Sequence, residues 1–293
     1  MAALGEIPWL VRLVWNHPAN RHGRVSAMAR LVGWQFWKHV VGQPREFVLA
    51  DQIRLRAWPD STVASLLIYC RGRPDWDEMG LLAHYLRPGD AVIDVGANIG
   101  SYTLLAAKLV GAAGRVDAFE PAPRTAARLR ENLALNGFSW VVVHEAAAGA
   151  EIHTVRFVDA LGATSHIAVA SEAGAGIEVP MVRLDDLLGE RRYALAKLDI
   201  EGAELAAFQG AERMLFDGNP PLILLEINRS LLRFGYSEAD LVAWLAGRGY
   251  RVGLYHVESR TFSWPDRPWL ARENVVAVHE PSFELVRRRL ELP

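Results

Sequence analysis

The stretch Val92-Ile93-Asp94-Val95-Gly96-Ala97-Asn98-Ile99-Gly100 reads as a buried strand that ends in a glycine-bearing turn. A helical pattern over residues 101–110 follows at once. Glycine lets the backbone turn sharply and come close to a ligand, and ligands of open parallel sheets bind beyond the carboxyl ends of the strands. The turn therefore predicts a binding site, and the residues expected to form it are Asp94, Gly96, Asn98 and Gly100.

Strand and helix patterns alternate around that turn. Strand patterns lie at residues 91–95, 115–119, 140–143, 195–200 and 222–227, and helical patterns at 76–87, 101–110, 125–135, 203–216 and 238–247. The alternation breaks in the middle, where strands are expected at 154–158 and 177–182. Two last strands, at 250–255 and 274–278, have no helix between them, which predicts one antiparallel strand. Repeated strand–helix units predict an α/β fold with a parallel sheet covered on both faces.

The N-terminal part has a different composition. Residues 7–45 contain no Asp or Glu but carry six cations, which are Arg12, Arg21, Arg24, Arg30, Lys38 and Arg45. Four tryptophans interleave with them, and apolar residues at 25, 28, 31, 32 and 36 recur at the spacing of an amphipathic helix. We interpret this segment as a helical cap, because tryptophan at helical spacing more often packs than recognises a ligand. The alternative is a surface for peripheral contact with a membrane or an anionic acceptor.

Residues 46–70 predict extended structure, with strands at 47–49, 53–56 and 63–69 and a turn at 58–61. We therefore expect two domains: residues 1–75 form an extension of helices and a β-hairpin, and residues 76–293 form the ligand-binding domain.

The composition limits the classes of function. The net charge of −2 argues against a nucleic-acid partner, and it assigns no oligomeric state. Cys70 is the only cysteine, which excludes an intrachain disulfide and a cysteine-rich zinc site and favours a cytoplasmic location. No secretory signal is evident, and no apolar run approaches the ~20 residues that span a bilayer.

The charges at the strand ends distinguish between two kinds of cofactor. A dinucleotide site of the pattern G-x-G-x-x-G would need glycine at Asn98 and at Ser101, and Asp94 would repel a pyrophosphate. S-adenosylmethionine carries an ammonium and a sulfonium and no phosphate, so Coulomb attraction favours it over NAD. Glu120 ends the next strand, where a carboxylate can accept both ribose hydroxyls. We expect S-adenosylmethionine to be held by Asp94, Gly96, Asn98, Gly100 and Glu120.

A second acidic segment, Ala196-Lys197-Leu198-Asp199-Ile200-Glu201-Gly202-Ala203-Glu204, ends another strand. Methyl transfer is a direct displacement, which requires alignment of the acceptor and removal of its proton. We expect Asp199 to orient or deprotonate the acceptor, with Lys197 and Glu201 beside it. Alternatively, Glu201 and Glu204 serve the helix dipole, or three carboxylates bind a divalent cation. The adjacent Lys197 argues against a metal, and none is expected.

Together these motifs resemble the FkbM-type methyltransferases, a branch of the Rossmann-like S-adenosylmethionine-dependent enzymes. The resemblance rests on residues 94–100, 118–121, 184–187 and 197–204, and it extends over about residues 75–280. It implies a doubly wound seven-stranded sheet whose last strand is antiparallel, and cofactor contacts at the glycine turn and Glu120. It also implies a hydroxylated acceptor such as a sugar, a glycan or a natural product.

Two other classes of function are consistent with parts of the sequence. One is an NAD-linked oxidoreductase, against which the missing second and third glycines count. The other is a non-catalytic Rossmann-like binding module, tethered to a membrane or a nucleic acid through residues 7–45.

Overall fold

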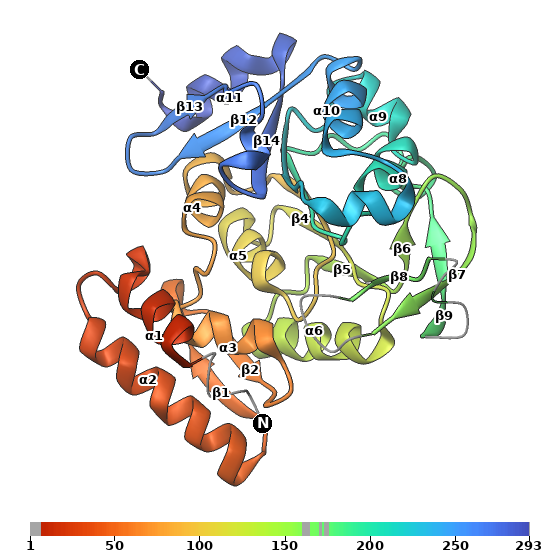
Figure 1. Cartoon of the computed structure of the whole chain (residues 1–293). Coiled ribbons are helices and arrows are strands. Elements are labelled where there is room, and N and C mark those ends of the chain that lie inside the picture. The colour runs from red at the N-terminus through yellow and green to blue at the C-terminus, as the bar shows by residue number, and fades with distance from the viewer. Residues whose placement is uncertain (1–6, 160–164, 170–171, 173–175, 293) are drawn as a thin grey trace. The chain divides into compact units, whose positions relative to one another are not determined.

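The computed structural model describes residues 7–159, 165–169, 172 and 176–292, so residues 1–6 of the expected extension lie outside it. Its contacts divide the chain into two compact units, one of residues up to 76 and one of residues from 77 onward (Figure 1). Within the described part of the chain, no helix combines the length and the apolar character that crossing a bilayer requires.

The first unit combines helices with one β-hairpin. Helix α1 is Ile7–Asn16, α2 is Arg24–Phe36, and the wider turn of a π-helix, Trp37–Val41, prolongs α2. Strands β1 (Arg45–Val48) and β2 (Arg54–Ala57) pair antiparallel, which confirms the expected hairpin.

The strand expected at 63–69 is wrong, because helix α3 occupies Thr62–Tyr69. The Ser61 hydroxyl accepts a hydrogen bond from the Ala64 amide at 3.1 Å and thereby caps the helix. A short apolar run does not by itself distinguish a strand from a buried helix.

The second unit is built on an eight-stranded sheet in the order β13-β12-β14-β11-β10-β3-β4-β5. The strands are β3 (Ala91–Val95), β4 (Arg115–Phe119), β5 (Val141–His144), β10 (Leu195–Leu198), β11 (Leu222–Glu226), β12 (Tyr250–His256), β13 (Thr261–Ser263) and β14 (Asn274–His279). Neighbours from β5 to β11 run parallel, whereas β14 runs antiparallel to both β11 and β12. This order contains the expected seven strands with the last antiparallel, and β13 adds an eighth at the edge by a hairpin with β12.

Helices cover this sheet. They are α4 (Trp76–Tyr85), α5 (Ser101–Val110), α6 (Pro123–Asn136), α7 (Leu184–Leu187), α8 (Glu204–Gln209), α9 (Glu212–Phe216), α10 (Glu238–Ala246) and α11 (Phe283–Leu290). The core joins Ile93 and Leu225 of the sheet to Phe208 of α8, Met214 of α9 and Leu241 of α10. The alternation of strands and helices in the sequence thus produces the Rossmann-like α/β architecture (Figure 1).

The single helix expected at 203–216 is broken into α8 and α9. The Asp185 carboxylate accepts hydrogen bonds from the amides of Arg213 (2.9 Å) and Met214 (3.0 Å), so it satisfies the first turn of α9. A second helix therefore starts where the sequence pattern continues unbroken.

A small four-stranded sheet forms where the alternation breaks. Its order is β6 (Ala147–Ala148), β9 (Ile177–Val182), β7 (His153–Val158) and β8 (His166–Ile167). The strands expected at 154–158 and 177–182 are therefore present, and Phe157, Val179 and Met181 form their own apolar cluster.

Candidate active site

The turn after β3 is fixed by backbone contacts that only glycine permits. Gly96 adopts φ +85°, and a Cβ at this position would lie 2.0 Å from the carbonyl oxygen of Asp199. The amide of Gly96 donates to the Phe119 carbonyl at 3.0 Å. Gly100, at φ +108°, directly precedes α5. Strand, turn and helix therefore succeed one another as the sequence predicts, and the turn lies against the ends of β4 and β10.

Asp94 is a buried carboxylate, and one of its two oxygens accepts no hydrogen bond from the described residues. Its side chain is 1% exposed, and its Oδ2 atom accepts a hydrogen bond from the Thr103 hydroxyl at 2.5 Å. The Oδ1 atom has no hydrogen-bond partner among the described residues. Burial raises the pKa of Asp94, and the positive charge of Lys197 opposes that rise. Such an oxygen fits a ligand that brings a donor or a positive charge.

Glu120 connects the glycine turn after β3 to the loop after β4 by hydrogen bonds. Its Oε2 atom accepts the Asn98 amide at 2.9 Å, and its Oε1 atom accepts the Ala122 amide at 3.0 Å. Burial raises the pKa of Glu120 to about 7, although both amides lower it. Each carboxylate oxygen has a second acceptor site, so the side chain can still accept two hydroxyl groups.

A cluster of carboxylates lies at the ends of β10 and β11. Oxygen atoms of Asp199, Glu201 and Glu226 all lie within 4.8 Å of one another, and we call these three residues the acidic cluster. Burial, followed by the charges of Asp199 and Glu201, raises the pKa of Glu226 well above its ordinary value. The raised pKa favours the protonated form of Glu226, which can donate a hydrogen bond within the cluster.

Lys197 brings a positive charge to the same place. Its Nζ atom donates to Asp199 Oδ2 at 3.1 Å and lies 4.9 Å from the centre of the Tyr102 ring. Lys197 is the register partner of Asp94 on the neighbouring strand. The Lys197 ammonium group therefore lies between Asp94 and the acidic cluster.

Glu204 does not join the cluster, contrary to the grouping of Asp199, Glu201 and Glu204 considered for a metal. Its side chain turns back so that Oε1 accepts the amides of Ile200 (3.0 Å) and Gly202 (3.3 Å). Burial raises the pKa of Glu204 to about 7. Glu204 therefore supports the loop, and Glu226 from the next strand takes the third place.

Two basic side chains that are not among the predicted site residues act on Glu201. The charges of His166 and Arg233 lower its pKa, although burial raises it more. A guanidinium nitrogen of Arg233 lies 2.6 Å from His166 Nε2 and donates to Glu172 at 2.8 Å. The position of His166 in the irregular middle segment was a signal, whereas nothing in the sequence distinguished Arg233.

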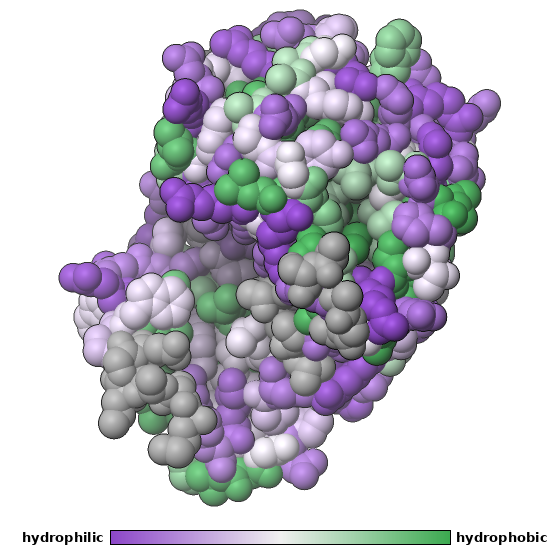
Figure 2. Space-filling model, turned by 45° about the vertical axis from the view of Figure 1, so that its right-hand side comes forward, coloured by the Kyte–Doolittle hydropathy of each residue, from purple (hydrophilic) through white to green (hydrophobic). Residues whose placement is uncertain are grey.

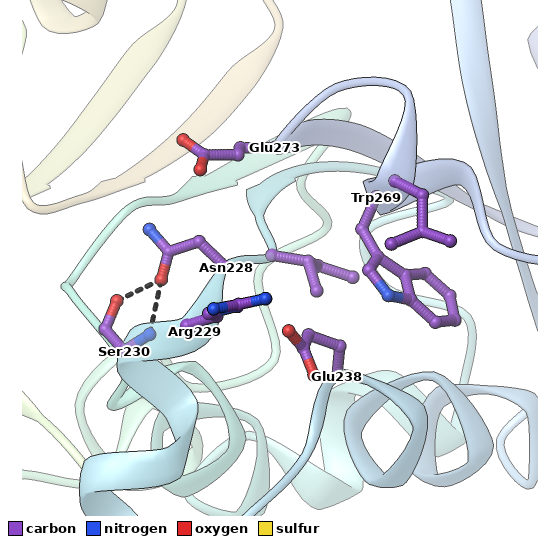
Figure 3. Close-up of a pocket in the computed structure, with 8 residues that line it drawn as sticks. Asn228, Arg229, Ser230, Glu238, Trp269 and Glu273 are labelled. Atoms are coloured by element: carbon purple, nitrogen blue, oxygen red, sulfur yellow. Dashed lines mark hydrogen bonds between the residues drawn. The ribbon is translucent and has the colours of Figure 1, made fainter.

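A pocket of about 440 Å³ opens beyond the end of β11 (Figure 3). It begins next to Glu226, because Ile227, the residue that follows Glu226, lines it. Figure 3 shows the carboxylates of Glu238 and Glu273, the guanidinium of Arg229 and the indole of Trp269 around it. The pocket therefore offers hydrogen-bonding groups and one large aromatic face.

Comparison with known proteins identifies the domain. A family model described as the methyltransferase FkbM domain matches residues 94–252, which is more than half of the chain. The protein-L-isoaspartate O-methyltransferase of Ignicoccus hospitalis is 32% identical over 100 residues, 34% of this chain and 47% of that protein. The ribosomal RNA large subunit methyltransferase E of Sorangium cellulosum is 33% identical over 94 residues, 32% of this chain and 44% of that protein. The matches thus span less than half of either relative.

A solved structure of methyltransferase FkbM from Methylobacillus flagellatus aligns with a TM-score of 0.44 and 18% identity, over 87% of this chain and 60% of that chain. The family match covers the glycine turn, Glu120 and the acidic cluster. The spare oxygen of Asp94 and the free acceptor sites of Glu120 fit a cofactor with a cationic end and ribose hydroxyls. The chain belongs to the FkbM family of S-adenosylmethionine-dependent methyltransferases.

Proposed function

We propose that the protein methylates a hydroxyl group of a sugar, a glycan or another hydroxylated natural product. S-adenosylmethionine supplies an electrophilic methyl group. In this proposal the cofactor is held by Asp94, Gly96, Asn98, Gly100 and Glu120. The observation that supports the proposal is the acidic cluster: its member Asp199 directly follows β10, the strand that pairs with the strand of Asp94.

Asp199 accepts the proton that the acceptor hydroxyl loses. The hydrogen bond from Lys197 orients the Asp199 carboxylate, and the protonated Glu226 offers it a second hydrogen bond. Glu201 lies within the same cluster and orients the acceptor. A base fixed in this way would remove the proton as the acceptor oxygen takes the methyl group from the cofactor sulfur, which would leave as the thioether of S-adenosylhomocysteine.

The pocket next to Glu226 supports a hydroxylated acceptor. An aromatic ring such as that of Trp269 can pack against the apolar face of a sugar ring, while the carboxylates of Glu238 and Glu273 can accept hydrogen bonds from its hydroxyl groups (Figure 3). The net charge of −2 gives no general attraction for nucleic acid. The expected cytoplasmic location belongs to this proposal as well, since Cys70 is a free and buried thiol.

The test is incubation of the protein with isotopically labelled cofactor and candidate glycans or extracts, followed by mass spectrometry for a methyl gain. We expect Asp199→Asn to lose most of the turnover and to keep its affinity for S-adenosylhomocysteine. The matched control is Glu151→Gln, because Glu151 is an exposed acid outside the site.

Unchanged turnover of Asp199→Asn would remove Asp199 from the reaction. Binding of S-adenosylhomocysteine without transfer to any acceptor would favour the non-catalytic binding module instead.

A further inference from the structure

Helix α2 has two apolar faces, and only one of them packs within its own unit. Ala27, Leu31 and Trp34 are buried, and the Trp34 indole donates to the Ser65 hydroxyl at 2.9 Å. Val25, Val32 and Phe36 are exposed by 78%, 64% and 62%. At 100° per residue, the exposed set lies on the side of the helix opposite to the buried set.

We call Val25, Ala29, Val32 and Phe36 the outer stripe. These four residues are exposed and are spaced by four, three and four positions, so they form one continuous line along the helix. Val40, 65% exposed, and Val41, 39% exposed, extend this apolar surface into the π-helical turn. A surface helix normally turns polar residues to water, and an exposed apolar surface is typical of sites that contact a partner.

Aromatic side chains accompany the stripe. Trp9 and Trp15 of α1, the helix that packs beside α2, are 62% and 41% exposed. Figure 2 shows hydrophobic residues gathered at the lower edge of the view, the level at which α2 ends in Figure 1. Tryptophan is favoured where an apolar medium meets water.

The positive charges around the outer stripe indicate which kind of partner it contacts. No acidic residue occurs between positions 7 and 45, whereas Arg12, Arg24 and Arg45 are exposed. The Arg24 guanidinium lies 5.7 Å from the Trp15 ring centre, and that of Arg45 lies 4.7 Å from the Trp37 ring centre. Cations beside exposed aliphatic and indole groups match the anionic headgroups and the acyl chains of one bilayer surface.

We propose that the outer stripe and the π-helical turn insert into the interfacial layer of an anionic bilayer. Helix α2 then lies in the plane of the membrane, with its inner face still packed on its own unit. The arginines contact lipid phosphates, which add electrostatic attraction to the burial of apolar surface. This proposal concerns the first unit only and is independent of the methyl acceptor.

The experiment uses the full chain and two kinds of vesicle, phosphatidylcholine alone and phosphatidylcholine with phosphatidylglycerol. Sedimentation measures the bound fraction, and tryptophan fluorescence measures insertion. We expect binding to the anionic vesicles only, and a loss of at least tenfold in affinity for Val32→Asp and for Phe36→Asp. The matched control is Phe216→Asp on α9, because Phe216 is 78% exposed and should leave binding unchanged.

Circular dichroism melts and S-adenosylhomocysteine binding show that each variant is folded and that its cofactor site is intact. Absence of binding to anionic vesicles by the folded wild-type chain would overturn the proposal, as would an equal loss for the Phe216→Asp control. Light scattering tests a second copy as the occupant. A wild-type dimer that Phe36→Asp dissociates, with no dependence on lipid, would assign the stripe to an interface between copies and would also overturn it.

Discussion

Replacing Asp94 by asparagine keeps the shape of the side chain and removes its charge. The amide oxygen can still accept the Thr103 hydroxyl, but the spare Oδ1 position can no longer offer a carboxylate oxygen to a cationic ligand. A hydrogen bond to a charged group contributes about 1.5–3 kcal/mol. We therefore expect S-adenosylhomocysteine to bind about 10- to 150-fold more weakly.

The same substitution should not weaken the fold. Burial raises the pKa of Asp94, which means that holding this charge away from water destabilises the protein without ligand. We expect the free energy of unfolding of Asp94→Asn without ligand to equal or exceed that of the wild-type protein.

Asp117 provides the matched control, because it lies beside Ile93 in the same sheet and is also fully buried. Protein donors occupy both of its oxygens: Arg115 at 2.7 Å, His144 at 2.9 Å and Tyr193 at 2.9 Å. Burial raises the pKa of Asp117, but these hydrogen bonds outweigh burial and hold it below its ordinary value. Asp117→Asn should therefore cost about 3 kcal/mol of stability and leave cofactor affinity unchanged.

The sign of the pH dependence follows from that lowered pKa. The contribution of Asp117 is present above the pKa of the unfolded chain and is lost as the pH falls through the folded value. The stability difference between wild type and Asp117→Asn should therefore shrink in acid.

Calorimetric titration with S-adenosylhomocysteine and urea unfolding separate the two aspartates. The reasoning would be refuted if Asp94→Asn bound the ligand as tightly as the wild-type protein. It would fail equally if Asp117→Asn lost the same affinity without losing stability.

Three further predictions follow from the site. Gly96→Ala should destabilise the protein in urea far more than Gly89→Ala, because a Cβ at 96 would lie 2.0 Å from the Asp199 carbonyl oxygen. At Gly89, with φ +91°, a Cβ would have no atom of the described residues within 4 Å apart from its chain neighbours, so Gly89→Ala should cost only the backbone strain of about 1–2 kcal/mol. Equal losses of stability would contradict the close contact at Gly96. The raised pKa of Glu120 contributes stability that is fully present below its ordinary value of 4.5 and is lost as the pH rises through about 7. The melting temperature of Glu120→Gln should therefore fall less over that pH range than the melting temperature of the wild-type protein. An equal fall in both proteins would assign the loss of stability to other groups. Chelation by EDTA should leave turnover unchanged, because Lys197 already supplies a positive charge 3.1 Å from Asp199; a loss that magnesium restores would show that the acidic cluster works with a metal.

The errors of the sequence prediction share one cause. The apolar residues of α3 have the composition of a strand, and the pattern across α8 and α9 continues without a break. Ser61 selects a helix in the first case, and Asp185, distant in the chain, starts a new helix in the second. Hydrogen bonds to residues outside a segment decide whether and where its helix begins, and the periodicity of the segment gives no information about those bonds.

The outer stripe shows the same limit for a surface. The spacing of apolar residues at 25, 28, 31, 32 and 36 correctly predicts a helix in α2. It groups Leu31, which is buried, with Val25 and Val32, which are exposed. Only the packing of neighbouring elements determines which apolar face is covered.

The sequence alone determined the α/β architecture, the glycine turn and the family resemblance, because strand–helix alternation and the φ freedom of glycine are properties of short segments. Tertiary structure decided which carboxylates meet. The parallel pairing of β10 with β11 brings Glu226 to Asp199 and Glu201, and the turn of Glu204 toward its own backbone keeps it away. The protonation of these groups depends on burial and on charges from separate strands, and those are fixed only when the sheet has formed.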